Sequence, residues 1–410
     1  MNDLPTRIAY EQAVAIVQRV AGERRLTQER IAIRRADGRI LAEPIQAPIS
    51  LPPFDNSRMD GFALRHADVQ HADTRADSPV RLRIVGEQFA GYDTGLRIGA
   101  GECARITTGA PLPAGADTVV VKENVREHDG VIDLEAIPGA GADIRRAGDD
   151  VAAGDVVLQA GQVLTPARLS LIAALGIADV MVSRRPTVAV FTTGDELVEP
   201  GLPLAPGQIY NSNRELLMGL LRAQGLEPTA WPSLPDDPTR IESQLRDAAS
   251  AFDVVITCGG VSAGEKDLLP AMLGTHGQIH FWKVRMKPGM PVLFGTLERA
   301  AFLGLPGNPV SVLATFSNLG RALLDGLQGR EESRPRWFAA LAAAWTKTHD
   351  RHEFLRGRLN CGPDGRLSVT PHPADASHRL RGAADSDVLI VLPEGARNYA
   401  SGDVVEVIGY

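Results

Sequence analysis

Asp253-Val254-Val255-Ile256-Thr257-Cys258-Gly259-Gly260-Val261-Ser262-Ala263-Gly264-Glu265-Lys266-Asp267 is the stretch that decides the fold. Its apolar and β-branched beginning predicts a buried strand, and the two glycines that follow predict a tight turn. Glycine adopts positive φ angles at low cost, so the backbone of such a turn can lie directly against a ligand. Ligands bind at the carboxyl ends of strands in parallel α/β sheets. We therefore expect this turn, with Ser262, Gly264 and the carboxylates Glu265 and Asp267, to form part of a binding site.

A second stretch, Phe302-Leu303-Gly304-Leu305-Pro306-Gly307-Asn308-Pro309-Val310-Ser311, has the same order of strand and turn. Asn308 is a suitable N-cap and Pro309 suits a first helical turn, so we expect a helix over Val310–Gly320. The free N–H groups at such a helix start favour an anion. From Pro186 onward, strands alternate with stretches of helical pattern, which predicts a parallel α/β sheet.

The composition narrows the class of protein. The chain has 410 residues, which is enough for about three or more domains. Its mean hydropathy of -0.07 suits a soluble globular protein, and no apolar run approaches the ~20 residues of a membrane span. The net charge of -7 argues against nucleic-acid binding, which needs clustered Lys and Arg. Three dispersed cysteines and an N-terminus without a signal pattern predict a reducing, cytoplasmic setting.

Changes of pattern along the chain predict four parts. Residues 1–45 together with 145–182 are expected to form a discontinuous helical and extended N-terminal domain, with residues 46–144 as a β-rich insert. Residues 183–329 are expected to form the α/β domain, and residues 330–410, rich in short strands and turns, a small C-terminal β domain. The expected fold class is thus α/β plus β in several domains.

Polar loops in the first half have two interpretations. Residues 54–63 carry Ser57 and Asp60 after a Pro-rich entry, and by composition alone an Asx or Ser turn is favoured over a polar site. Residues 80–106 are expected to be β-rich, and residues 105–111 end a strand in the hydroxyls of two threonines, the second of which is Thr108. Residues 143–150 set two arginines against aspartates, which is usual for an exposed charged turn but also suits an arginine directed at an anion.

The loops of the α/β domain carry acids and lysines near their glycine turns. Carboxylates of this kind can bind Mg²⁺ through oxygen, and lysines can bind an oxyanion or a phosphate. Neither a Walker A pattern nor an initial Gly-x-Gly-x-x-Gly is present, which disfavours ordinary NTPases and dehydrogenases. The residues alone leave open a Mg-dependent binder or transferase of phosphorylated or oxyanionic ligands, or a non-catalytic binding module. The side chains in question are Asp195, Glu196, Asp236, Asp237, Glu265, Asp267, Lys283 and Lys287.

Seven loops, taken together and in order, resemble the molybdopterin molybdenumtransferase (MoeA) family, which is related to the gephyrin E domain. The resemblance covers nearly the full length. The loops are Pro53–Ala63, Arg105–Pro111, Ile144–Asp150, Phe191–Leu197, Gly259–Asp267, Lys287–Gly289 and Leu305–Ser311.

The resemblance implies an activity and a setting. It implies a cytoplasmic homodimer with an elongated protomer that inserts molybdate into adenylylated molybdopterin, releases AMP and requires Mg²⁺. This is the last step of molybdenum cofactor biosynthesis. Small-molecule substrates are implied, with transient contacts to the proteins of molybdopterin synthesis and adenylylation, and with neither nucleic acid nor membrane as a partner.

The resemblance also implies roles for individual residues. Asp267, Glu196 and Asp236 would bind Mg²⁺ or a nucleotide phosphate, and the Gly259–Gly264 loop would hold pterin or pyrophosphate. Asp60 and Thr108, from the insert of the other subunit, would close the cleft. The residues implied in catalysis are Asp60, Thr108, Glu196, Asp267, Lys283 and Lys287. Those implied in substrate binding are Arg145, Asp150, Asp236, Gly259, Gly260, Ser262, Gly264, Pro306, Pro309, Arg351, Arg356 and Ser377, with the lysines, an arginine and Ser377 placing molybdate.

Simpler roles stand beside these. Without the motif, Lys283 is best interpreted as a surface lysine, and the two prolines as residues that shape loops. Two positions depart from the family pattern. Met290 stands where a second lysine is frequent, which lowers the local positive charge, and Asn211 stands where an aspartate is common, which removes a metal or ribose contact.

Two rival functions remain at this stage. A related adenylyltransferase is essentially the α/β domain alone, whereas this chain adds about 180 residues before that domain and a β domain after it. A scaffold, as in gephyrin, would not need the site carboxylates that this chain retains.

Overall fold

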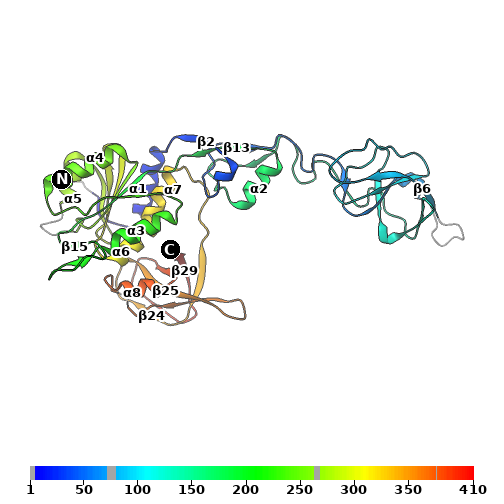
Figure 1. Cartoon of the computed structure of the whole chain (residues 1–410). Helices are drawn as coiled ribbons and strands as arrows, with labels where there is room; N and C mark the ends of the chain where they lie inside the picture. The colour runs from blue at the N-terminus through cyan, green and yellow to red at the C-terminus, as the bar shows by residue number, and fades with distance from the viewer. Residues whose placement is uncertain (1–4, 72–79, 263–267, 375) are drawn as a thin grey trace.

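The computed structural model describes residues 5–71, 80–262, 268–374 and 376–410. The chain is elongated. An α/β block and a C-terminal β domain lie at one end, and a β-rich insert lies at the other (Figure 1). Between them, thin paired segments run through a smaller domain that contains β2, β13 and α2.

A seven-stranded sheet forms the centre of the α/β block. All its strands point the same way except β21, which is antiparallel to both neighbours. The expected parallel sheet thus contains one reversed strand, because only Glu298 and Arg299 connect β21 to β22, and so short a turn can join only antiparallel strands. The strands, in spatial order, are β1 (Thr6–Ile8), β19 (Gly277–Val284), β21 (Leu293–Leu297), β22 (Ala300–Leu305), β18 (Val254–Cys258), β14 (Val188–Thr192) and β17 (Thr229–Ala230).

Helices cover both faces of this sheet. In β14, Val188 and Val190 join the core on one face, and Ala189 and Phe191 join the core on the other, so the strand is apolar throughout. Among the described residues, no helix is both long and apolar enough to cross a bilayer. The first face holds α1 (Tyr10–Glu23), α3 (Ser212–Arg222), α6 (Pro309–Thr315), the π-helical turn η4 (Phe316–Gly320) and α7 (Arg321–Leu327), and the second holds α4 (Pro238–Ala251) and α5 (Leu269–His276).

The beginning of the chain packs with the α/β block. Strand β1 pairs with β19, and α1 packs against α7. A side chain at Gly326 would lie 2.6 Å from the Cβ of Ala21, so glycine permits this close helix contact. Strand β1 and helix α1 lie within the range 1–45, which the sequence pattern assigned to the N-terminal domain. Their apolar side chains are instead buried in the core of the α/β block.

The remaining N-terminal segments form the smaller domain around Leu41, Leu164 and Ile172. Thr165 caps α2 through its side chain, as its Thr-Pro sequence predicts. The elements are β2 (Gln28–Ala32), η1 (Ile33–Arg35), β3 (Ile45–Gln46), β12 (Val156–Leu158), α2 (Pro166–Ala174) and β13 (Asp179–Ser183), with β2 paired to β13 and β3 to β12.

The insert is built on a six-stranded sheet with the order β8-β5-β7-β6-β10-β9. Strand β5, which lies next to the edge strand β8, is wholly buried. A pair formed by β4 and β11 lies where the chain enters and leaves the insert. The elements are β4 (Asn56–Ser57), β5 (Gly61–Leu64), η2 (His66–Asp68), β6 (Arg81–Gln88), β7 (Glu102–Ile106), β8 (Thr118–Val121), η3 (Lys122–Asn124), β9 (Val125–His128), β10 (Val131–Leu134) and β11 (Ile144–Arg145).

The C-terminal domain is a closed barrel of five strands in the order β25-β26-β23-β29-β27, because β27 also pairs with β25. Closure leaves these five strands with few free edges. Strand β20, from the α/β block, pairs with β25 and attaches the barrel to that block. The elements are β20 (Met286–Lys287), β23 (Trp337–Leu341), β24 (Trp345–Lys347), β25 (His352–Cys361), β26 (Leu367–Pro371), α8 (Leu380–Ala384), β27 (Val388–Leu392), β28 (Arg397–Tyr399) and β29 (Val404–Gly409).

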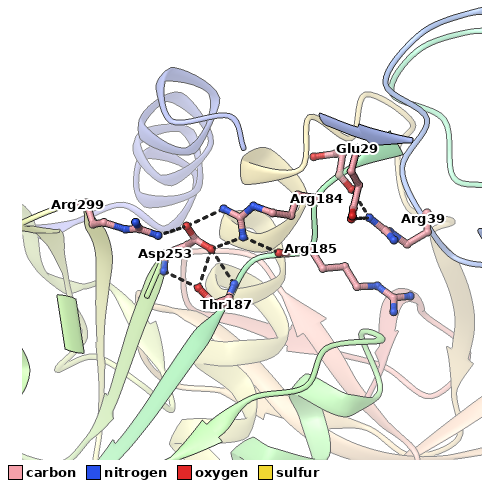
Figure 2. A network of polar contacts seen from close by, with 8 residues as sticks. Glu29, Arg39, Arg184, Arg185, Thr187, Asp253 and Arg299 are labelled. Atoms are coloured by element: carbon pink, nitrogen blue, oxygen red, sulfur yellow. Dashed lines mark hydrogen bonds and ion pairs between the residues drawn. The ribbon is translucent and has the colours of Figure 1, made fainter. Parts of the chain in front are cut away.

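A carboxylate at the start of β18 ties the smaller domain to the α/β block (Figure 2). Asp253 accepts hydrogen bonds from both terminal nitrogens of Arg184, at 2.8 and 2.9 Å, and from Arg299 at 3.2 Å. It also accepts from the amide and the hydroxyl of Thr187, both at 2.8 Å. Burial by itself would raise the pKa of Asp253, but the bonds from Arg184 and Thr187 outweigh it and lower the pKa to about 2.

We expect Asp253→Asn to lower the free energy of unfolding of the α/β block by about 2 kcal/mol at pH 7, because it leaves Arg184 without its ionic partner. The native pKa is lowered, so the contribution is fully present above the ordinary pKa of 3.8 and is lost as pH falls toward 2. Urea unfolding at several pH values should therefore show a difference between variant and wild type that shrinks below about pH 4. Asp247→Asn, on the exposed side of α4, is the control. A difference that does not change with pH would contradict this account.

Candidate active site

A cavity of about 480 Å³ lies at the carboxyl ends of β14, β18 and β22. Loops of the α/β block form most of its wall, and His378 and Leu380 of the C-terminal domain complete it. Parallel strands end at the same sheet edge, so their loops meet there. The expected residues on this wall are Gly259, Gly260, Glu196, Asp236 and Pro309, whereas Pro306 is buried beside it and Ser262 is exposed next to the glycine turn.

The glycines let two loops approach each other closely. Gly259 has φ +98°, and a Cβ there would lie 2.5 Å from the hydroxyl and 2.9 Å from the carbonyl oxygen of Thr193. Its amide donates to Leu305 at 3.0 Å, which joins the loops after β18 and β22. Gly194, with φ +139°, leaves the space that the carboxylate of Glu196 fills. Glycine is therefore required in the predicted turn, because the two loops lie too close together for a larger residue and the backbone has a positive φ.

Helix caps direct the neighbouring side chains. Asp237 caps α4 by accepting from the amides of Thr239 and Arg240, as expected, which leaves the preceding Asp236 on the cavity wall. The amide of Asp236 donates to Asp195 at 3.1 Å. These contacts bring the two turns that carry Asp236 and Glu196 together at the cavity.

Asn211 is buried and has a structural role. Its amide group donates to Thr192 at 2.8 Å and to Ser233 at 3.1 Å, and its oxygen caps α3 by accepting from Arg214. The asparagine that stands here in place of the family's common aspartate thus has hydrogen-bond partners for both its amide group and its oxygen. Asn213, whose role no pattern in the sequence indicates, donates to the carbonyl oxygen of Gly307 at 2.6 Å and links α3 to the loop before α6.

The C-terminal domain meets the cavity through Ser377. Asn308 is the N-cap of α6, but its side chain donates to the hydroxyl of Ser377 at 3.0 Å in place of a cap bond. The amide of Val310 donates to the carbonyl of Ser377. Arg356 is only 3% exposed and donates to the carbonyl oxygens of Ala374, Ala376 and Arg379. Arg356 therefore lies behind the loop that carries Ser377, where the sequence alone suggested a contact with molybdate.

Lys283, near the carboxyl end of β19, and Lys287, on β20, are not among the residues that line the cavity. The ammonium of Lys283 lies over the ring of Trp282 at 4.2 Å, and the indole of Trp282 donates to Val261 at 2.8 Å, beside the glycine turn. Lys287 forms an ion pair with the buried Glu353 at 3.0 Å. Arg351 is half-buried in the turn before β25. Gly264, Glu265 and Asp267 lie outside the described residues.

The residues expected from the insert lie elsewhere. Asp60 accepts hydrogen bonds from the amide of Thr108 at 2.8 Å and from its hydroxyl at 2.9 Å, and these bonds lower the pKa of Asp60. Arg145 pairs with Asn56 nearby, and Asp150 follows at the base of the insert. All of them are exposed. The insert lies far from the α/β block of its own chain (Figure 1), and none of these four residues lines the cavity.

The carboxylate oxygens at the cavity suit a hard cation, such as Mg²⁺, that is bound in part by the substrate. No cluster of three or more His, Cys, Asp or Glu side chains fit to hold a metal occurs in the described ranges. Glu196 and Asp236 nevertheless present carboxylates on one wall, and Mg²⁺ in proteins is often held by one or two carboxylates plus substrate phosphates. Burial raises the pKa of the Cys258 thiol, so a thiolate nucleophile is not available there.

Three family models match consecutive parts of the chain. They are the MoeA N-terminal region (domain I and II) over residues 8–176, a probable molybdopterin binding domain over 189–326, and the MoeA C-terminal region (domain IV) over 339–410. Molybdopterin molybdenumtransferase of Haemophilus influenzae is 41% identical over 92% of this chain and 93% of its own length. The chain belongs to the molybdopterin molybdenumtransferase family. This membership confirms the resemblance that the seven loops indicated.

Other relatives of this family agree. Molybdopterin molybdenumtransferase 2 of Mycobacterium tuberculosis is 38% identical over 92% of this chain and 94% of its own. A solved molybdopterin biosynthesis MoeA protein of Pyrococcus horikoshii has a TM-score of 0.84 at 28% identity, covering 98% of this chain and all of that chain. The expected multi-domain fold with a separate C-terminal β domain is thereby confirmed.

Gly259→Ala tests the close contact between the two cavity loops. We expect it to destabilise the α/β block by about 1–3 kcal/mol and to impair ligand binding, because the new methyl would clash with Thr193 at a positive φ. Gly207→Ala is a matched control, since Gly207 also has a positive φ, +86°, but nothing lies within 4 Å of its missing Cβ. Thermal unfolding and molybdopterin titration should separate the two variants. Equal effects would show that backbone strain alone matters.

Proposed function

We propose that this protein is a molybdopterin molybdenumtransferase that inserts molybdate into the dithiolene of adenylylated molybdopterin and releases AMP in a Mg²⁺-dependent reaction. The observation that supports the proposal is the cavity at the sheet edge, where carboxylates and glycine turns of the loops that resemble the family lie together, with the Ser377 loop bonded to Asn308 on the cavity lining. Full-length similarity to curated transferases supports the same reaction. The reaction requires an oxyanion to be placed beside the dithiolene, so orientation of the reactants is the main contribution of the protein.

Each wall of the cavity has its own proposed role. Glu196 and Asp236, with Asp267, would hold Mg²⁺ against the substrate phosphates, where the ion would neutralise charge on the leaving AMP. Gly259 and Gly260 would admit the pterin or pyrophosphate to close backbone contact.

The molybdate dianion would be placed by cationic and hydroxyl groups beside the glycine turn. Lys283 and Lys287 supply the positive charge from the α/β block, and Ser377 or Arg351 approaches from the C-terminal domain. Arg356 would act through the backbone of the Ser377 loop and would not itself touch molybdate.

We also propose that the active unit is a cytoplasmic homodimer in which each cavity receives the insert of the other subunit. Within one chain the insert, which carries the exposed Asp60 and Thr108, lies far from the α/β block (Figure 1), and the length of the molecule prevents its reaching the cavity without large rearrangement. A symmetric pair of long protomers would let each insert cover its partner's cavity. The three unpaired cysteines are compatible with a reducing compartment.

The first test is molybdate-dependent AMP release from adenylylated molybdopterin in the presence of Mg²⁺. Wild type should release AMP, whereas Asp267→Ala and Glu196→Gln should lose at least about 100-fold in rate, because the metal and phosphates lose a charged ligand. Asp247→Ala, exposed on α4, should behave as wild type. A folded wild type without AMP release would instead favour a scaffold role, and full activity in both carboxylate variants would remove those residues from the site.

Subunit complementation tests the shared site. Asp60→Ala and Glu196→Ala homodimers should each be inactive, but mixing them under exchange should restore about a quarter of wild-type activity. Half of the dimers would then be mixed, and each mixed dimer would have one cavity with both residues intact. If both residues served the cavity of their own chain, each cavity in a mixed dimer would lack one of them. No restoration, with exchange verified by mass spectrometry, would contradict the shared site.

A further inference from the structure

Three large apolar side chains line the cavity in addition to its carboxylates. They are Ile209, Tyr210 and Leu380, and their exposed fractions are 55%, 45% and 40%. Large apolar side chains left in water at a cavity commonly mark a surface that a ligand covers. Leu380 comes from the C-terminal domain, so these side chains come from the same two domains that the contact between Asn308 and Ser377 joins.

The ring of Tyr210 is held in position. Its hydroxyl donates to the carbonyl oxygen of Leu202 at 2.9 Å, which restrains the side chain while almost half of it stays exposed. The strand pair formed by β15 (Leu197–Val198) and β16 (Ile209–Tyr210) sets Tyr210 opposite Val198. The amide of Ile209 also donates to the carbonyl of Glu196 at 2.9 Å. The backbone that carries the ring is thus bonded directly to the backbone that carries a carboxylate of the site.

We propose that Tyr210 on the lining of this cavity is the subsite that receives a planar heteroaromatic ring of the substrate. The inference rests on the proposed function, whose substrate carries two such rings, a pterin and an adenine. A fixed aromatic ring with an exposed face binds a flat ring at little entropic cost, because few rotamers have to be frozen on binding. The polar residues of the cavity then remain available to bind the phosphates and molybdate. The subsite sets the orientation of the substrate along the cavity.

The test is calorimetric titration of the full-length protein with two ligands, AMP and molybdopterin that carries no nucleotide. Tyr210→Ala should raise the Kd of one of them by roughly 5- to 150-fold, the range expected for loss of one stacked ring. Tyr210→Phe keeps the ring and should bind within about twofold of wild type. Trp337→Ala removes an aromatic residue elsewhere, on β23, that is 60% exposed against 45% for Tyr210, and should leave both affinities unchanged. Thermal unfolding verifies that each variant is folded.

The two ligands identify which ring is bound. A loss confined to AMP assigns the adenine to the subsite, and a loss confined to molybdopterin assigns the pterin. Unchanged affinity of Tyr210→Ala for both ligands overturns the inference. A loss in Tyr210→Phe as large as in Tyr210→Ala also overturns it, because the hydroxyl and not the ring face would then be responsible.

Failure of the proposed function is separable from failure of the subsite. If wild type binds AMP or molybdopterin through Tyr210 but releases no AMP from the adenylylated substrate, the proposed subsite is supported and the proposed transferase function is overturned. If wild type releases AMP but Tyr210→Ala binds both ligands as wild type does, the proposed transferase function is supported and the proposed subsite is overturned. Wild type that binds neither ligand overturns both.

Discussion

The ionic contact at Asp253 is the constraint on which the arrangement of the molecule depends (Figure 2). Asp253 immediately precedes β18, and it accepts hydrogen bonds from Arg184 in the segment that leaves the smaller domain, from Thr187 just before β14, and from Arg299 in the turn before β22. The starts of three adjacent strands are therefore fixed to one carboxylate that is 8% exposed. A buried charge with so many donors holds a defined geometry, because leaving any one partner unpaired is costly. Arg39 donates to the carbonyl oxygen of Ser183 at 2.8 Å, which extends the same anchorage into the smaller domain.

The consequences of that anchorage appear at the opposite ends of the same strands. Strands β14, β18 and β22 are each five or six residues long and buried along their length. Because each strand is short and extended, the position of its first residue also determines the position of its last residue. Their ends are the three turns of the cavity, joined by the bond from Gly259 to Leu305 and by the close approach of Gly259 to Thr193. Stability is concentrated in the sheet, and the chemistry lies in loops positioned by it.

The sequence was most informative where local chemistry determines structure. The strand and glycine turn at Asp253–Gly260, the Asp237 cap and the helix start at Thr165 follow from residue type and spacing, and the structure has all three. It was least informative about long-range partners. The pairing of β1 with β19 joins residues almost 280 positions apart, and the burial of Arg356 depends on carbonyl groups of a loop 18 to 23 residues away. Tyr210 was passed over because an exposed aromatic residue beside a turn has no periodic signal. Only the cavity gives it significance.

The shape of the chain gives a physical reason for dividing a site between subunits. An insert held at the end of a long, thin connection gains little stability from the α/β block, and its own core, built around Phe62 and Val120, must support it. Asp60 and Thr108 nevertheless hold a defined geometry on its surface through two hydrogen bonds, one of which comes from the backbone. Exposed polar groups that are ordered by bonds to each other are prepared for contact with another surface, since the entropy of ordering them has already been lost on folding. In a dimer that surface would be the cavity of the second chain, and closing it would exclude water from the reacting oxyanion only when both subunits are in place.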